Sequence, residues 1–247
     1  MRSVSGRIAL LLLAVALTLI VFAPATWLGD WIAQRSRLRL IDAEGTLWDG
    51  SAILAVSDGT KARLVSGRLS WRVRWGGLAS GRMVIRLSHP FLDHEVDVSF
   101  DGRTLRAGEG KARAPAGVLA VMGAPFDTLR LGGELRLQWD TLGLGEANLE
   151  GSLQLDWSNA QSALSQVAPL GNFRVTLTGH GSRGDVRLIT LEGPLLLQGE
   201  GVLERGRLRF SGTADALPEM RASLNGLIGV LGPRSGDKAL LRWDSQV

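Results

Sequence analysis

The fold is decided by a pattern that the chain carries twice, first as Gly133-Glu-Leu-Arg-Leu-Gln-Trp139 and again as Gly151-Ser-Leu-Gln-Leu-Asp-Trp157. In both stretches apolar residues alternate with polar ones. A period of two places the two kinds of side chain on opposite faces of a β-strand. Each stretch therefore predicts a strand with one apolar and one wet face, and their close spacing predicts two strands of one meander.

The same alternation dominates the chain beyond residue 40, and glycines separate the alternating runs. Strands with one wet face favour antiparallel pairing, because parallel sheets are covered on both faces. We expect a mainly β protein whose antiparallel β-rich domain is a curved sheet, groove or sandwich. Its halves, 40–125 and 126–247, are expected to form two sheet layers. The further alternating runs are 69–75, 83–88, 95–101, 173–178 and 207–210.

Two or three short helices are predicted to interrupt the strands. Ser158 and Gln161 have the spacing of a capping box, a pair of side chains that begins a helix. Apolar residues follow at helical spacing until Pro169, which would stop the helix. The other predicted helices are 116–122 and 220–231, and each is followed closely by glycine and proline.

The N-terminal part of the chain carries a long apolar run. Residues 8–23 contain no charged residue, and the apolar character continues to residue 28. About 20 apolar residues cross a bilayer as a helix, and Trp27 and Trp31 follow where an aromatic belt is found in membrane proteins. We predict a single transmembrane helix. The predicted division is a tail, 1–7, the transmembrane helix, 8–28, and an exported β-rich domain, 29–247.

A cleaved signal peptide is the alternative interpretation of the same segment. Arg2 and Arg7 would form its basic region, 8–22 its apolar region, and Ala23-Pro24-Ala25 its small-residue cleavage site. Both interpretations export the rest of the chain and differ on whether it stays tethered. Three arginines between residues 35 and 39 nearly balance the basic N-terminus, so charge does not fix the orientation.

Composition excludes several classes of protein. The absence of cysteine excludes a disulfide scaffold, a thiol enzyme and a Cys-ligated zinc site. The net charge is +4, from 28 Lys+Arg and 24 Asp+Glu. A nucleic-acid binder needs clustered basic charge, and the best cluster, 68–75, is typical of a strand with one arginine-bearing face. We therefore expect no nucleic-acid partner.

Candidate chemistry is sparse. A metal hypothesis would take His89, Asp93 and His94 as ligands, but their spacing matches no helical zinc motif and a polar loop is the plainer interpretation. Ser235 and Lys238 have the spacing of a serine–lysine pair without its companion motifs. We expect no catalytic residue, no cofactor and no metal, and hence no enzyme. An exported enzyme remains the alternative only if His89 and His94 hold a metal.

Several short motifs, taken in their order along the chain, resemble protein N of the bacterial type II secretion system. The resemblance spans nearly the whole chain. The motifs are Pro24…Trp27, Gly45-Thr-Leu-Trp48-Asp-Gly50, Leu69-Ser-Trp71-Arg72, Gly133-x-Leu-x-Leu, Trp157-x-x-Ala160 leading to Pro169-Leu-Gly171, Gly199-x-Gly201…Leu208-Arg-Phe210-x-Gly212-x-Ala214 and Leu227…Leu231-Gly-Pro233-x-x-Gly236.

The resemblance implies a single-pass protein of the bacterial inner membrane with a cytoplasmic tail and a periplasmic body. It implies an accessory part in exporting folded periplasmic proteins across the outer membrane, with other subunits of the system as partners, namely the inner-membrane platform or the secretin. It brings no catalytic residue.

For the contact with such a partner we predict the segment that holds Gly45, Thr46, Trp48 and Gly50. Its glycines would form a turn, and Trp48 would be an anchor of the hot-spot type. A core role for Trp48 is the alternative. A competing function is an AsmA-like lipid-binding or lipid-transfer protein, in which the apolar face of the strands would line a groove for acyl chains.

Overall fold

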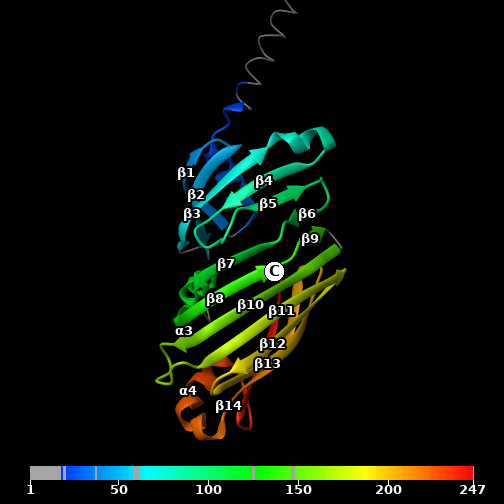
Figure 1. Ribbon diagram of the computed structural model, residues 1–247. Helices are drawn as coiled ribbons and strands as arrows, with labels where there is room; N and C mark the ends of the chain where they lie inside the picture. Colours follow the sequence, from blue (N-terminus) through cyan, green and yellow to red (C-terminus); the bar gives the residue numbers. More distant parts are fainter. Residues whose placement is uncertain are drawn as a thin grey trace, which may run out of the picture.

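The computed structural model describes residues 18, 21–36, 38–57, 62–123, 126–145 and 148–246. Within these residues sixteen strands form one hydrogen-bonded sheet, and its named strands pair antiparallel (Figure 1). The prediction of a mainly antiparallel β protein is therefore confirmed. The strands are β1 (Leu38–Gly45), β2 (Asp49–Ser57), β3 (Ala62–Arg74), β4 (Met83–Ser88), β5 (Val96–Phe100), β6 (Leu105–Ala107), β7 (Gly110–Pro115), β8 (Leu131–Trp139), β9 (Leu142–Gly145), β10 (Asn148–Ser162), β11 (Gly171–Gly181), β12 (Arg183–Glu192), β13 (Leu195–Glu204), β14 (Arg207–Ala216), β15 (Arg234–Ser235) and β16 (Lys238–Gln246).

Short helices lie at turns and at one end of the sheet. The predicted helices 116–122 and 220–231 are present, the first as a 3₁₀ helix and the second as a short 3₁₀ turn that leads into α4. Figure 1 places α4 at the end of the molecule opposite the first strands. The described helices are α2 (Ala25–Arg35), η1 (Trp75–Ser80), η2 (Ala116–Met122), α3 (Phe126–Leu129), η3 (Pro218–Met220) and α4 (Arg221–Leu231).

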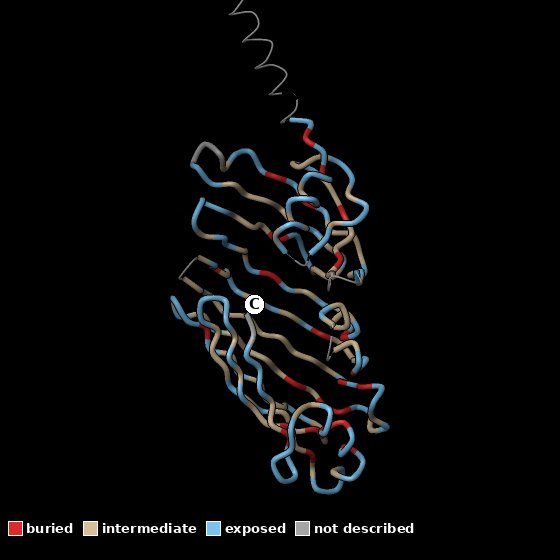
Figure 2. Tube along the Cα trace, turned by 180° about the vertical axis from the view of Figure 1, so that it is seen from behind, coloured by how far each residue is buried: buried red, intermediate tan, exposed pale blue. Residues whose placement is uncertain are grey.

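Two buried clusters hold the sheet, one toward each end. Near the N-terminus, Ala25 of α2 packs against Ala52 and Trp71, and Figure 2 shows buried segments in this region and around α4. At the other end Leu224 of α4 is fully buried among residues of β10 to β16. The two regions belong to one sheet because the three-residue strand β6 pairs with both β5 and β9.

The two-layer arrangement predicted for the halves 40–125 and 126–247 is wrong. The ladder runs without interruption from β5 through β6 and β9 to β10, so the halves are consecutive parts of one sheet. Alternation indicates only that a strand has two unlike faces. It does not tell whether a second sheet packs on the apolar face or whether the ladder continues at the edge of the strand.

The helix predicted to begin at Ser158 is also wrong. Residues 158–162 continue β10, where Ser158 pairs with Glu134 and Ala160 pairs with Gly171. Asn159 has a φ of 49°, and the ladder shifts register around it, which is the geometry of a β-bulge. Ala160 enters the core with no exposed surface, so tertiary packing overrides the local helix signal.

The predicted transmembrane segment, 8–28, lies mostly outside the described residues. Its last four residues, 25–28, form the first turn of α2, and Ala25 there is 1% exposed. Among the described residues, no helix has the length and apolar character that a bilayer crossing requires.

Candidate functional site

The four residues predicted for partner contact come together in a tight turn between β1 and β2. The Thr46 hydroxyl accepts hydrogen bonds from the N–H groups of Trp48 (3.3 Å) and Asp49 (3.1 Å). Gly45 has a φ of 82°, and a Cβ there would lie 2.5 Å from the carbonyl oxygen of Asp49. A Cβ on Gly50 would lie 2.7 Å from the carbonyl oxygen of Thr46. Gly45, Thr46 and Gly50 therefore have structural roles in shaping the turn.

Trp48 is half-buried and lies against the first residue of η1. The ring centroids of Trp48 and Trp75 are 4.6 Å apart with the planes tilted by 48°. The Trp48 carbonyl accepts the N–H of Val73 (2.7 Å), and the Leu47 carbonyl accepts the indole N–H of Trp71 (3.1 Å). The turn is thus fastened to the end of β3, and Trp48 is neither fully core nor fully surface.

The same turn is also fastened to the segment that precedes α2. The Leu47 N–H donates to the carbonyl of Ala23 (2.8 Å), and Pro24 forms an isolated antiparallel bridge with Thr46. Gly29 of α2 packs on Leu40 of β1, where a Cβ would be 3.5 Å from the Leu40 side chain. The turn therefore fixes the point at which the N-terminal segment meets the sheet.

Three arginines of β3 are paired with carboxylates of β1, β2 and β5. Arg68 pairs with Asp42, Arg72 with Asp49 (2.9 Å), and Arg74 with Asp97 (3.4 Å). A hydrogen bond from Arg86 is the main cause that holds the pKa of Asp97 below its ordinary value. Pairing of this kind makes the face charge-balanced, in contrast to the uncompensated basic surface that nucleic acid requires.

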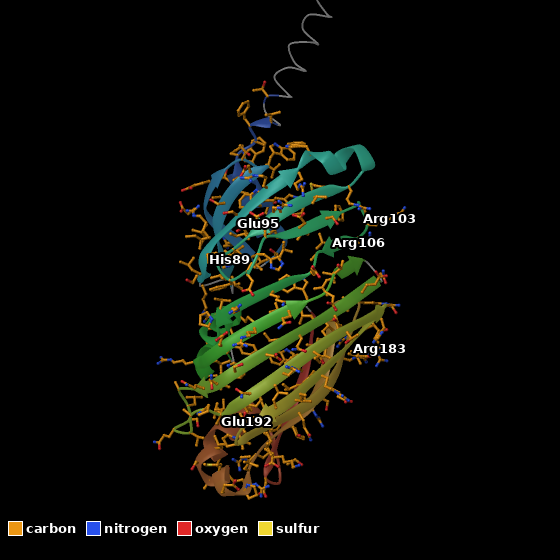
Figure 3. All side chains as sticks on the ribbon, viewed as in Figure 1. His89, Glu95, Arg103, Arg106, Arg183 and Glu192 are labelled. Atoms are coloured by element: carbon orange, nitrogen blue, oxygen red, sulfur yellow. The ribbon has the colours of Figure 1, made fainter. Side chains whose placement is uncertain are left out.

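A shallow trough of about 980 Å³ crosses the polar face of β11 to β14 and β16, and sequence reasoning did not anticipate it. Its charges are largely matched: Arg187 pairs with Glu200 (3.0 Å), and Arg183 with Asp185 (2.8 Å). Figure 3 shows Arg183 and Glu192 at opposite ends of β12. Apolar side chains, among them Phe210 and Trp243, line the trough beside these ion pairs.

The residues proposed for metal binding or catalysis have other partners. His89 Nδ1 accepts the N–H of Phe91 (3.1 Å), and Asp93 pairs with Arg113 (3.2 Å). Within the described residues, no three His, Asp or Glu side chains are grouped closely enough to hold a metal ion. Ser235 and Lys238 pair across the β15–β16 hairpin, and the Lys238 ammonium lies 3.6 Å from a carboxylate oxygen of Asp215.

An apolar row crosses the short middle strands. Phe100 of β5 is directly opposite Leu105 of β6, and Leu105 is directly opposite Leu144 of β9. These three side chains are 40%, 41% and 49% exposed. Cross-strand partners lie on the same face of a sheet, so the row is a continuous, partly open apolar strip.

The fold and these contacts define a β-sheet scaffold protein whose first helix is fastened to its first strands. The family model described as type II secretion system (T2SS), protein N, matches residues 36–240, and the chain belongs to this family. The protein is thus a component of the type II secretion system. It interacts with other subunits of that system in the cell envelope. Comparison with curated proteins and with solved structures gives no match.

Sequence reasoning missed the role of Trp75. It predicted a strand through residue 75, but β3 ends at Arg74 and Trp75 begins η1. The signal that marks this boundary is the glycine pair that follows, Gly76 and Gly77, because adjacent glycines end regular elements. The contact between Trp75 and Trp48 joins residues far apart in sequence and leaves no local pattern.

Proposed function

We propose that this protein is an accessory component of the type II secretion system, anchored in the inner membrane with its body in the periplasm. It supports the export of folded periplasmic proteins across the outer membrane by binding other subunits, and it acts without catalysis. The observation that carries this proposal is the family match over residues 36–240, which begins just before β1 and ends within β16. The matched region is thus nearly the whole sheet.

The turn of residues 45–50 supports a contact role at the N-terminal end. It contacts the residues that precede α2, and its hydrogen bonds to Ala23 and Val73 hold it rigidly. A rigid site reduces the entropy that binding costs. Trp48 is half-buried and packs against the tilted ring of Trp75, and tryptophan is among the residue types most enriched at binding hot spots.

The test is complementation of a strain that lacks this protein. Trp48→Ala should reduce export of secreted proteins, while the variant chain accumulates in the envelope and keeps the thermal unfolding midpoint of the unmodified chain. Leu191→Ala is the matched control, because Leu191 is also a large apolar side chain, 48% exposed, on the distant strand β12. Its export should be unchanged.

Two outcomes would contradict this role for the turn. Normal export with Trp48→Ala would exclude a contact there, and loss of the folded chain would assign Trp48 to the core. A photo-crosslinking residue at position 48 in intact cells then identifies the partner. An adduct with the inner-membrane platform or the secretin is expected, and the absence of any secretion-subunit adduct would contradict the proposed contact.

A second candidate function is an AsmA-like periplasmic lipid-binding or lipid-transfer protein. The observation that favours it is the partly open apolar row of Phe100, Leu105 and Leu144. Exposed apolar residues that are contiguous mark binding surfaces more often than isolated ones do. The row lies on the apolar face of the strands, where acyl chains would lie.

Lipid extraction and mass spectrometry of the purified chain test this candidate. Stoichiometric phospholipid that is lost in a Leu105→Asp, Leu144→Asp double variant would support lipid binding. If the double variant retains the same phospholipid, the phospholipid belongs to the detergent micelle around the membrane anchor. That result would reject lipid binding on the apolar row.

A further inference from the structure

Three aromatic side chains from separate segments are exposed at the end of the sheet where the N-terminal segment enters. Phe22 precedes α2, Trp27 lies in its first turn, and Trp75 begins η1; they are 70%, 56% and 53% exposed. We call these three residues the aromatic platform. Several large apolar side chains exposed at one end of a molecule are typical of an interaction site.

Hydrogen bonds and ring contacts place the members of the platform at one end of the molecule. The main-chain N–H of Trp27 donates to the carbonyl of Pro24 (3.2 Å). Pro24 in turn forms an isolated β-bridge with Thr46 in the turn between β1 and β2. The ring of Trp48 in that turn packs at a tilt against the ring of Trp75. Figure 1 shows η1, the cyan coil between β3 and β4, at the end of the molecule opposite α4.

We propose that the aromatic platform docks on the membrane surface, so that the first strands of the sheet rest against the bilayer. The inference rests on the proposed inner-membrane anchor, to which Phe22 and Trp27 belong, and adds to it a contact of Trp75 with lipid. The occupant is the headgroup region of the phospholipid bilayer. Trp48 then acts as a support that holds Trp75 in place.

Two features favour lipid over another protein as the occupant. Residues 1–17 precede the first described residue, and the uncharged apolar run of residues 8–23 ends at Ala23, directly after Phe22. A membrane anchor that ends there brings the bilayer surface to these side chains. Tryptophan is also enriched at the level of lipid headgroups, where its ring is apolar and its N–H stays wet.

Glycines with open surroundings allow a sharp test, because the chain has no cysteine of its own. A Cβ on Gly76, beside Trp75, would meet no atom within 4 Å, and the same holds for Gly226 on the distant helix α4. Gly76→Cys and Gly226→Cys variants of the full chain are labelled with a polarity-sensitive fluorophore. They are then reconstituted in vesicles of phosphatidylethanolamine and phosphatidylglycerol.

Nitroxide-bearing lipid should quench the label at position 76, with a blue shift of its emission, and leave the label at position 226 unaffected. Adding Trp75→Ser to the Gly76→Cys chain should restore the emission of a water-exposed label, while circular dichroism confirms an intact sheet. Both results together support the platform.

Other outcomes overturn the inference in distinguishable ways. If the chain floats with the vesicles and the label at position 76 is not quenched, the anchor stands and the platform is rejected. A blue shift without quenching by lipid assigns the patch to a second copy of the chain and likewise rejects lipid docking. If the chain fails to float with the vesicles, the proposed anchor fails, and the inference fails with it.

Discussion

Single glycines and indoles decide how closely the strands approach. The Trp139 indole donates to the carbonyl of Gly108 (2.7 Å), and its ring occupies the space where a Cβ of Gly110 would lie. Trp157 and Trp71 make the same kind of bond, to the carbonyls of Gly132 (2.9 Å) and Leu47 (3.1 Å). In each case a buried or half-buried indole satisfies its N–H with a main-chain carbonyl, as buried polar groups require.

Replacing Gly110 tests this packing. A Cβ at this position would lie 2.1 Å from the Trp139 ring, so Gly110→Ala must displace the indole and should lower the free energy of unfolding by about 1–3 kcal/mol. Gly76→Ala is the control, because nothing lies near its Cβ, and it should change stability by less than about 0.5 kcal/mol. Denaturant unfolding of the full chain in detergent gives both values, and equal stabilities would contradict the packing argument.

His89 makes the stability depend on pH. Burial lowers the pKa of His89, and the Gly67 main chain offsets the shift only in part. The unfolded chain therefore binds more protons than the folded chain once the pH drops below the ordinary histidine value of about 6.5. Stability is fully present above that value and is lost as the pH falls through the lowered folded-state pKa.

The thermal unfolding midpoint should accordingly fall between about pH 7.5 and about pH 5.5, and His89→Gln should reduce that loss. His180→Gln is the control, since the His180 side chain is 62% exposed, and it should keep the pH dependence of the unmodified chain. Identical pH profiles for the unmodified and His89→Gln chains would show that His89 does not carry the effect.

Among the elements, α4 and β10 do most to organise the C-terminal half. α4 presents Leu224, Leu227 and Ile228 to the sheet, all at most 3% exposed. β10 pairs with β8 on one side and with β11 on the other, and Asp156 forms a two-pronged ion pair with Arg174 directly across the β10–β11 ladder (2.6 and 2.9 Å). α4 therefore covers the apolar face of the sheet, and β10 fixes the register of β8 and β11.

Truncating the buried face of α4 should release the helix from the sheet. Leu224 has no exposed surface, so Leu224→Ala should lower the free energy of unfolding by about 2–5 kcal/mol. Val230→Ala on the same helix is the control, because Val230 is 50% exposed and its loss should be small. A comparable loss in both variants, measured by denaturant unfolding, would show that helix propensity, and not packing, explains the effect.

At the scale of the molecule, the strands of the described residues form one sheet with two separate cores. The core around Trp71 and the core around Leu224 share no buried residue, and the three-residue strand β6 and four-residue strand β9 join their strands. Short strands hold few hydrogen bonds, so the junction is expected to be the weakest part of the ladder.

Unfolding should therefore proceed in two cooperative steps, one for each core. In hydrogen exchange measured by mass spectrometry, Leu224→Ala should speed exchange in β11 to β16 and leave β2 to β4 unchanged, because the lost contacts belong to one core only. Equal acceleration in both regions would show that the sheet unfolds as a single unit.

The alternation of apolar and polar residues by itself indicated an antiparallel β protein. Alternation gives each strand one apolar and one wet face, and strands of this kind are typical of antiparallel sheets. The turn at residues 45–50 was also predictable from local sequence, because glycine favours tight turns. Only the tertiary structure decided that residues 158–162 stay in β10, that the halves join in one ladder, and that Trp48 meets Trp75. These outcomes depend on contacts between distant segments, whose packing energy exceeds the small local preferences that a sequence pattern reports.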